Sequence, residues 1–335
     1  MAVNIIMALN RFSFKRIIGR KGFTYMLVSS LLIVVLLGIF FAASRYRYED
    51  QEKVYQVRLR AMDDFVKSFN SDIHRATYIA SFRSLVALED SVTTQGYYLS
   101  DMNRSFKETF YYGTINGSSS VIMENSSFQD YVLRVSEIAQ SVGMNVKVNV
   151  TDILLSQSNP WSIDVEVHMR INISDNSRLA EWVMNNSYKT NIPIYNLRDP
   201  LYSKNTLNRV PNTIRKLNTS VLVSGVDTTK LVDLISGSYY ITSTSAPNFL
   251  MRFEGRTAPD ANGIESIVNI RTLSDQDIAV DYNRIKVDYI YFNDIENYSK
   301  ICNVTNIPSA YYFVIPSNST ALYQVQGLNY SSSCP

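Results

Sequence analysis

Residues 23–43 read FTYMLVSSLLIVVLLGIFFAA, a run of 21 residues without a charged side chain. As an α-helix this run is about 31 Å long at 1.5 Å per residue, close to the roughly 30 Å hydrocarbon core of a bilayer. A helix satisfies its own backbone in lipid, and Ser29 and Ser30 are tolerated because their hydroxyls can bond to carbonyls of the preceding turn. The sequence therefore predicts a transmembrane helix over residues 23–43, in contact with membrane lipid. A run of this length disfavours the alternative, a buried core helix.

The flanking charges predict the orientation of this helix. Residues 1–22 contain five Lys or Arg and no Asp or Glu, and basic flanks stay on the cytoplasmic side. Those five, taken from the 32 basic residues of the chain, leave 27 against 30 acidic residues, so the basic excess indicates topology and no nucleic-acid partner is expected. We expect a cytoplasmic leader over residues 1–22 and an extracellular bulk. The alternative is a signal peptide cut near Ala42-Ala43-Ser44, although its apolar region is usually only about 7–15 residues.

Glycosylation sequons give independent support for an outside location. After Phe23, 11 of the 27 asparagines begin an Asn-x-Ser/Thr sequon, about twice the number expected by chance. Asn4 and Asn10, on the basic side, begin none. This one-sided excess predicts a glycosylated surface protein. The candidate sites are Asn103, Asn116, Asn125, Asn149, Asn172, Asn185, Asn218, Asn297, Asn303, Asn318 and Asn329.

The two cysteines, Cys302 and Cys334, both fall in the predicted extracellular part. An even number of cysteines in an exported segment favours a disulfide, which would stabilise the C-terminal region by roughly 3.5–4 kcal/mol in the chain-entropy model. Two unpaired thiols are the alternative. No cluster of Cys and His with metal-ligand spacing is present, so no metal site is expected.

A helical pattern continues behind the apolar run. Apolar residues recur at spacings of three and four from Val54 to Ala80, and no Pro or Gly interrupts residues 39–95. The sequence predicts an amphipathic extracellular stem helix over residues 44–92, ended near Gly96. Its apolar stripe must be buried against the rest of the chain or against other copies of the protein.

Beyond the stem we expect an α+β head in two parts, residues 93–200 and 201–335, rich in antiparallel β-sheet. Residues 161–173 alternate without error between apolar and polar side chains, which predicts a half-buried strand paired with residues 146–154. Helices are expected from Ser100 or Asp101 to Phe110 and over residues 128–142. Residues 179–195 are compatible with a helix or a strand, and a strand is favoured. The second part is expected to be mostly β. Its strands are predicted over 219–226, 237–243, 248–254, 264–273, 284–292 and 310–315, with a short helix over 228–235.

The chain offers little chemistry for catalysis. His74 and His168 are its only histidines, and each lies among charged residues typical of a solvated face. No nucleophile elbow, Walker A loop or dinucleotide-binding motif is present. The sequence therefore predicts no enzyme, no catalytic or cofactor-binding residue and no cofactor. The 23 tyrosines, with runs such as Tyr111-Tyr112, are compatible either with sheet packing or with a binding surface.

The stretch Arg20-Lys21-Gly22-Phe23-Thr24, directly before the apolar run, resembles the class III signal of type IV prepilins, and the whole resembles an archaeal pilin-like surface protein. The resemblance covers residues 20–92. It implies cleavage between Gly22 and Phe23 by a prepilin-type peptidase, and self-association through the stem helices. Leu27 departs from the pattern, because most bacterial pilins have Glu at the fifth mature position.

From these features we expect a single-pass, glycosylated surface protein that acts in assembly or adhesion as a pilin-like subunit. One alternative is an unprocessed, membrane-tethered adhesin or receptor ectodomain. The other is an ectoenzyme, which would need a pocket with convergent titratable groups.

Overall fold

The computed structural model describes residues 20–293 and 301–331 and divides the chain into two compact units, residues 1–63 and 64–335. Helix α1, Arg20–Gln95, runs through 76 residues, as the absence of Pro and Gly after residue 38 predicts. It ends where expected: Gly96 has φ +71°, a conformation that glycine adopts readily, and its N–H donates to the carbonyl of Val92 at 3.0 Å.

The apolar stripe of α1 differs in exposure between its two ends. In the second unit Phe69, Ile73 and Ala80 are buried, in agreement with the predicted stripe. Closer to the apolar run, Val54 and Val57 are 64% and 67% exposed. The described chain therefore buries only the distal part of the stripe.

Two shorter helices, connected by a small hairpin, follow α1 within the second unit. Helix α2, Met102–Tyr112, begins at Asp101, whose side chain accepts from the N–H of Arg104. Helix α3, Phe128–Ser141, begins with a capping box in which Ser127 and Asp130 satisfy each other's backbone N–H. Both helices confirm the prediction. Between them lie β1 (Thr114–Ile115), β2 (Ser118–Ser119) and the 3-10 turn η1 (Val121–Met123).

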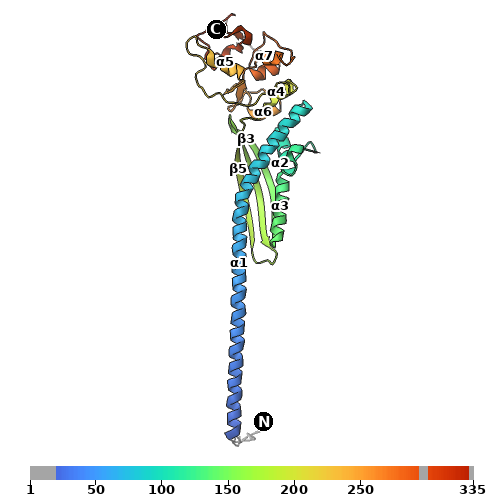
Figure 1. Cartoon of the computed structure of the whole chain (residues 1–335), viewed down its shortest axis with the longest axis vertical. Coiled ribbons are helices and arrows are strands. Elements are labelled where there is room, and N and C mark those ends of the chain that lie inside the picture. Colours follow the sequence, from blue (N-terminus) through green and yellow to red (C-terminus); the bar gives the residue numbers. More distant parts are fainter. Residues whose placement is uncertain (1–19, 294–300, 332–335) are drawn as a thin grey trace, which may run out of the picture. The chain divides into compact units, whose positions relative to one another are not determined.

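A three-stranded antiparallel sheet forms the centre of the second unit, in the order β3 (Met144–Asn159), β4 (Ser162–Asp175), β5 (Glu181–Pro193). All three predicted strands are confirmed, and the alternation in β4 divides its faces as expected: Ile163, Val165, Val167, Ile171 and Ile173 are buried, and the polar face is open or half-buried. Tyr188 of β5 connects this sheet to α1, because its hydroxyl donates to Asn70 at 2.7 Å and its ring contacts His74. Within this unit, Figure 1 shows α2 and α3 beside the strands.

The prediction that the second part is mostly β is wrong, because residues 196–331 form short helices, short strands and loops. No strand forms over 219–226, and the predicted strands 248–254 and 284–292 are wrong, because each contains a one-turn helix. Residues 264–273 divide into a short strand and a short helix, and the strands expected at 237–243 and 310–315 are each three residues long. The helix near 228–235 is confirmed. The elements are α4 Pro200–Asn205, α5 Thr229–Ser236, β6 Tyr240–Thr242, α6 Phe249–Phe253, β7 Ile264–Ser266, α7 Ile270–Ser274, α8 Asp288–Phe292, β8 Ile301–Asn303, η2 Ser309–Tyr311, β9 Val314–Pro316 and η3 Ser317–Ser319.

This region nevertheless has its own apolar core. The short helices α4, α5, α6 and α7 gather near the described C-terminal end (Figure 1). The core is centred on α5 and on the two-stranded ladder β8–β9, and Ile241 of a second ladder, β6–β7, packs against it. Its buried side chains include Leu231, Leu234, Ile267, Phe313 and Tyr323. The described chain is therefore α+β, with its regular sheet in residues 144–193.

Candidate functional site

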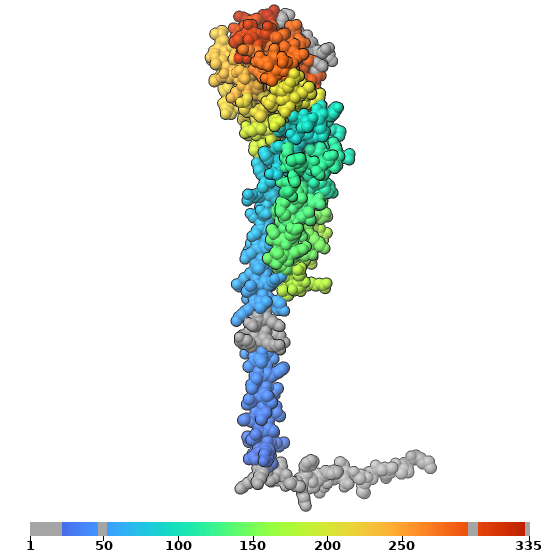
Figure 2. All heavy atoms as spheres, turned by 45° about the vertical axis from the view of Figure 1, so that its right-hand side comes forward, coloured from blue at the N-terminus to red at the C-terminus, as the bar shows by residue number. Residues whose placement is uncertain are grey.

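The apolar run forms the exposed first part of α1. Residues 22–45 are long and apolar enough to cross a membrane, and residues 22–43 are all exposed; Figure 2 draws this segment in blue. Ser29 and Ser30 donate to the carbonyls of Met26 and Leu27 at 3.1 and 3.0 Å, which confirms their predicted backbone bonds. This segment is therefore compatible with a single membrane span.

The predicted processing residues lie inside this helix. Gly22 and Phe23 belong to the first turn of α1, and Phe23 is 61% exposed. Leu27 is also exposed, at 53%. Cleavage between Gly22 and Phe23 stays a prediction.

The sequons are distributed over the surface of the second unit. Of the ten that the structure describes, eight have an exposed asparagine, while Asn172 and Asn303 are half-buried. Asn297 lies outside the described residues. The sheet brings two sequons together, because Asn149 of β3 and Asn185 of β5 both pair with Arg170 of β4. Their side chains share the polar face of the sheet, since directly paired residues point to the same side.

Cys302 lies in β8 and is fully buried in the core of residues 196–331. Its sulfur is disulfide-bonded. Cys334, its predicted partner, lies outside the described residues, and the pairing of the two stays a prediction.

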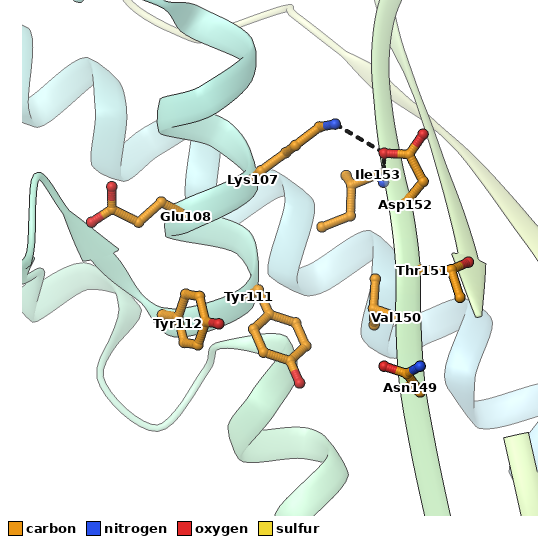
Figure 3. Close-up of a pocket in the computed structure, with 9 residues that line it drawn as sticks. All are labelled: Lys107, Glu108, Tyr111, Tyr112, Asn149, Val150, Thr151, Asp152 and Ile153. Carbon is orange, nitrogen blue, oxygen red and sulfur yellow. Dashed lines mark hydrogen bonds and ion pairs between the residues drawn. The ribbon is translucent and has the colours of Figure 1, made fainter. Parts of the chain in front are cut away.

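A surface pocket of about 540 Å³ lies between α2 and the outer edge of β3 (Figure 3). Its α2 wall is formed by Lys107, Glu108, Tyr111 and Tyr112, and its β3 wall by residues 149–153. The volume is within the range of about 300–1,000 Å³ that is typical of small-molecule sites.

A bulge in β3 determines which side chains face this pocket together. The register shifts between Val150 and Asp152, so that Asn149 pairs with Arg170 and Asp152 pairs with His168. Arg170 and His168 are two residues apart and lie on one face of β4, so Asn149 and Asp152 also share a face. In a regular strand these two residues, three apart, would point to opposite sides.

The helix side of the pocket matches this arrangement. Lys107 and Tyr111 are one turn apart on α2 and therefore lie on one stripe. Lys107 Nζ donates to Asp152 Oδ1 at 2.9 Å, and together with the N–H of Ile153 it holds the pKa of Asp152 below its usual range. Figure 3 shows this pair at one end of the pocket, and Tyr111 and Asn149 on opposite sides of its other end. The ring of Tyr112 meets that of Tyr111 edge-on, with centroids 4.7 Å apart.

A buried charge cluster in residues 196–331 has no counterpart among the predictions from the sequence. Arg252 of α6 donates through Nη1 to Asp199 Oδ2 at 2.6 Å and to Asp288 Oδ2 at 3.0 Å, and all three side chains are inaccessible to solvent. Tyr240 donates to Asp199 at 2.7 Å, and Ser266 Oγ donates to Asp288 at 2.9 Å. No periodicity connects these residues, since the partners of Arg252 are 53 and 36 positions away.

The cluster is a structural feature. Burial raises the pKa of Asp199, although the Arg252 guanidinium opposes that shift. For Arg252 burial lowers the pKa, but the attraction of the two carboxylates is greater and raises it overall. The charged side chains connect α4, α6 and α8, and none of the three reaches solvent.

Glu89 near the end of α1 is another buried acid, 6% exposed. Its carboxylate accepts from the N–H of Arg198 at 3.1 Å and lies 3.3 Å from Arg198 Nε. Burial raises the pKa of Glu89 to about 7, although the hydrogen bond from the Arg198 N–H lowers it. Glu265, fully buried and bonded to Tyr323, likewise has its pKa raised to about 7 by burial.

Within residues 20–293 and 301–331, no group of three or more His, Cys, Asp or Glu is arranged to hold a metal ion. His168 lies 3.4 Å from Glu166 on the polar sheet face, and His74 packs against Tyr188. Comparison of the chain with protein-family models, with curated proteins and with solved structures finds no match.

Proposed function

We propose that the protein is a single-pass, membrane-anchored surface glycoprotein and a pilin-like subunit. The observation that carries this proposal is helix α1, in which an exposed apolar segment and an amphipathic stem form one continuous helix of 76 residues. A globular protein with no partner would leave the apolar segment in water, at a cost that grows with the exposed apolar area. Lipid removes that cost.

The location of the second unit outside the cell is supported by charge and by the sequons. The basic residues before Gly22 favour a cytoplasmic N-terminus. The eight exposed sequon asparagines are all accessible to a glycosylating enzyme. In this orientation the disulfide of Cys302 lies in a compartment where disulfides persist.

Self-association through the stem is supported by its uncovered apolar residues. Val54, Val57 and Leu59 are 64%, 67% and 40% exposed, and they lie in the same helix, 9 to 14 residues beyond the end of the apolar segment at Arg45. Packing of stems from several copies would bury these side chains. Copies of the protein would then contact one another both through their apolar segments in the membrane and through their stems.

N-terminal sequencing of the full protein from its native cells tests the proposal. A processed subunit begins at Phe23, and a Gly22→Leu variant keeps residues 1–22 and forms no filaments. Gly38→Leu is the matched control, because Gly38 lies in the same helix with no atom within 4 Å of a Cβ placed on it, and it should be processed normally. An intact Met1 on the native protein would refute the pilin-like assignment.

One observation favours the second candidate, an unprocessed membrane-tethered adhesin. Leu27 places an exposed apolar side chain at the fifth position after Gly22, where most bacterial pilins have a carboxylate that helps to set subunit register. An intact N-terminus together with monomers in mild detergent would support this candidate. A protein without mass additions at any sequon would remove the glycoprotein part of both candidates.

A further inference from the structure

We propose that Asn149 carries an N-linked glycan whose first sugars occupy the pocket between α2 and β3, against the ring of Tyr111. The inference rests on the proposed extracellular location, and it adds a specific modified residue and a docking surface for the sugar. The occupant is thus part of the protein itself.

The sequon at Asn149 lies on the wall of the pocket. Asn149-Val150-Thr151 forms part of the β3 wall of the pocket, and Asn149 is exposed. The other sequon paired with Arg170, at Asn185, belongs to β5 on the far side of β4 and does not line the pocket. A sugar on Asn149 therefore starts at the rim of a preformed hollow, which distinguishes this sequon from its neighbour.

The two walls of the pocket are aligned with each other. The bulge at Val150–Asp152 places Asn149 and Asp152 on one face, and the helical spacing places Lys107 and Tyr111 on one stripe. The Lys107–Asp152 ion pair fixes one end of the pocket, and Tyr111 then lies across from Asn149 at the other end (Figure 3).

The chemistry of the pocket fits a sugar. Sugars present apolar C–H faces and many hydroxyls, so they suit an aromatic ring flanked by polar groups. Tyr111 and Tyr112 supply rings, and Tyr112 is 61% exposed. Lys107 and Asp152 supply charged groups for hydroxyls at the same pocket. The mixture of rings and charges is less suited to a purely apolar ligand.

The edge of β3 offers a second occupant, an added β-strand, which the bulge disfavours. Bulges interrupt the regular ladder that an incoming strand needs, and they are a common protection of edge strands. The ion pair of Lys107 with Asp152 also crosses the space beside this edge. A glycan requires no ladder and tolerates both features.

Attachment of the glycan is an ordinary transfer from an activated sugar phosphate. A bond forms between Asn149 Nδ2 and the anomeric carbon of the sugar, and the bond from that carbon to the donor's phosphate oxygen breaks. One amide proton leaves with the phosphate. A glycosyltransferase of the native cell and its sugar-phosphate donor supply the reactants for this step.

Glycopeptide mass spectrometry combined with tyrosine nitration tests the proposal on the full protein purified from native cells. Asn149 should carry a glycan, and nitration of Tyr111 and Tyr112 should be slower than in an Asn149→Gln variant. We expect a difference of at least about fivefold, the factor that corresponds to roughly 1 kcal/mol. Tyr97, 76% exposed and outside the pocket, is the internal control and should be nitrated equally in both proteins.

Two further variants keep the test decisive. Asn185→Gln, the matched loss of a neighbouring sequon, should leave nitration at Tyr111 and Tyr112 as slow as in the natural protein. Thr151→Ala should remove the Asn149 glycan and speed nitration, whereas Thr151→Ser should restore both properties. This pair separates glycan loss from a change in the asparagine side chain.

The outcomes separate this inference from the proposed function. Glycans at other sequons but none at Asn149 would overturn the inference and leave the surface-glycoprotein assignment intact. A glycan at Asn149 with unchanged nitration in Asn149→Gln would also overturn it, since the sugar would then point into solvent. No glycan at any sequon would overturn both.

Discussion

Replacement of Arg252 by methionine should lower the free energy of unfolding more than a substitution on the surface does. Methionine fills a similar space but removes the cation, and it leaves Asp199 and Asp288 facing each other in a site without solvent. Burial already raises the pKa of Asp199 in the presence of Arg252. Without the guanidinium, the two carboxylates lose their common hydrogen-bond donor.

The magnitude follows from the burial of the cluster. Removal of one partner of a buried ion pair typically costs about 3–5 kcal/mol of unfolding free energy, because a desolvated charge remains. The control is Arg256→Met, whose guanidinium is 60% exposed and lies 3.2 Å from Glu254. An exposed pair of this kind contributes about 0–1 kcal/mol.

Urea unfolding of the full protein in mild detergent measures the difference. Trp161 fluorescence is a suitable signal, because its ring is largely buried, stacks on Tyr195 and lies under Lys216. With a urea m-value of about 2 kcal/mol/M, the Arg252→Met midpoint should fall by about 1.5–2.5 M.

A charge-free variant separates electrostatics from packing. Arg252→Met combined with Asp199→Asn and Asp288→Asn removes the unpaired carboxylates and should recover part of the lost stability, as replacement of whole buried ion pairs often does. The reasoning would be refuted by an Arg252→Met cost below about 1 kcal/mol. It would equally be refuted by a triple variant less stable than Arg252→Met.

Three further predictions concern other parts of the second unit. Because burial raises the pKa of Glu89 from 4.5 to about 7, the folded state keeps a proton that the unfolded state releases between these values, so the contribution of Glu89 to stability should be greatest below pH 4.5 and should be lost as the pH rises through 7. Glu89→Gln should remove up to roughly 3 kcal/mol of this dependence, measured by urea unfolding at pH 5 and pH 8, and an unchanged slope would contradict it. Ser127→Ala removes the capping box of α3 and should cost about 1 kcal/mol in the same assay, whereas a loss no greater than that of Ser126→Ala would argue against the cap. Peptide mapping without reduction should recover Cys302 joined to Cys334, and recovery of either cysteine as a free thiol would refute the pairing.

Long elements were predictable from the sequence, because their periodic patterns extend over many residues. The thirteen alternating residues 161–173 predict a strand with one buried face. The structure confirms it as β4, which pairs with β3 on one side and β5 on the other. The unbroken stripe behind the apolar run likewise predicted α1 and its end at Gly96. Local end signals, such as Ser127 with Asp130 three residues later, placed α3 correctly.

Short apolar runs carried no such information. Residues 249–253, Phe-Leu-Met-Arg-Phe, suit a strand by composition, yet they form one helical turn that Asn248 caps. Residues 284–292 alternate like a strand, but the chain turns into α8 at Asp288. Over five residues the helix and strand patterns are equally compatible with such runs, and contacts with the rest of the core decide between them.

The candidate sites also differ in whether a local sequence pattern predicts them. The sequence by itself determined the apolar segment that is long enough to cross a membrane, its basic flank and the positions of the sequons, because these properties depend on composition and short spacing. Only the tertiary structure brought Asn149 opposite Tyr111, through a bulge in β3 and one turn of α2, and collected Asp199, Arg252 and Asp288 into one buried cluster. Both groups of residues are tens of positions apart in the sequence. The free energy that brings them together comes from burial in the folded chain, and no local sequence pattern encodes it.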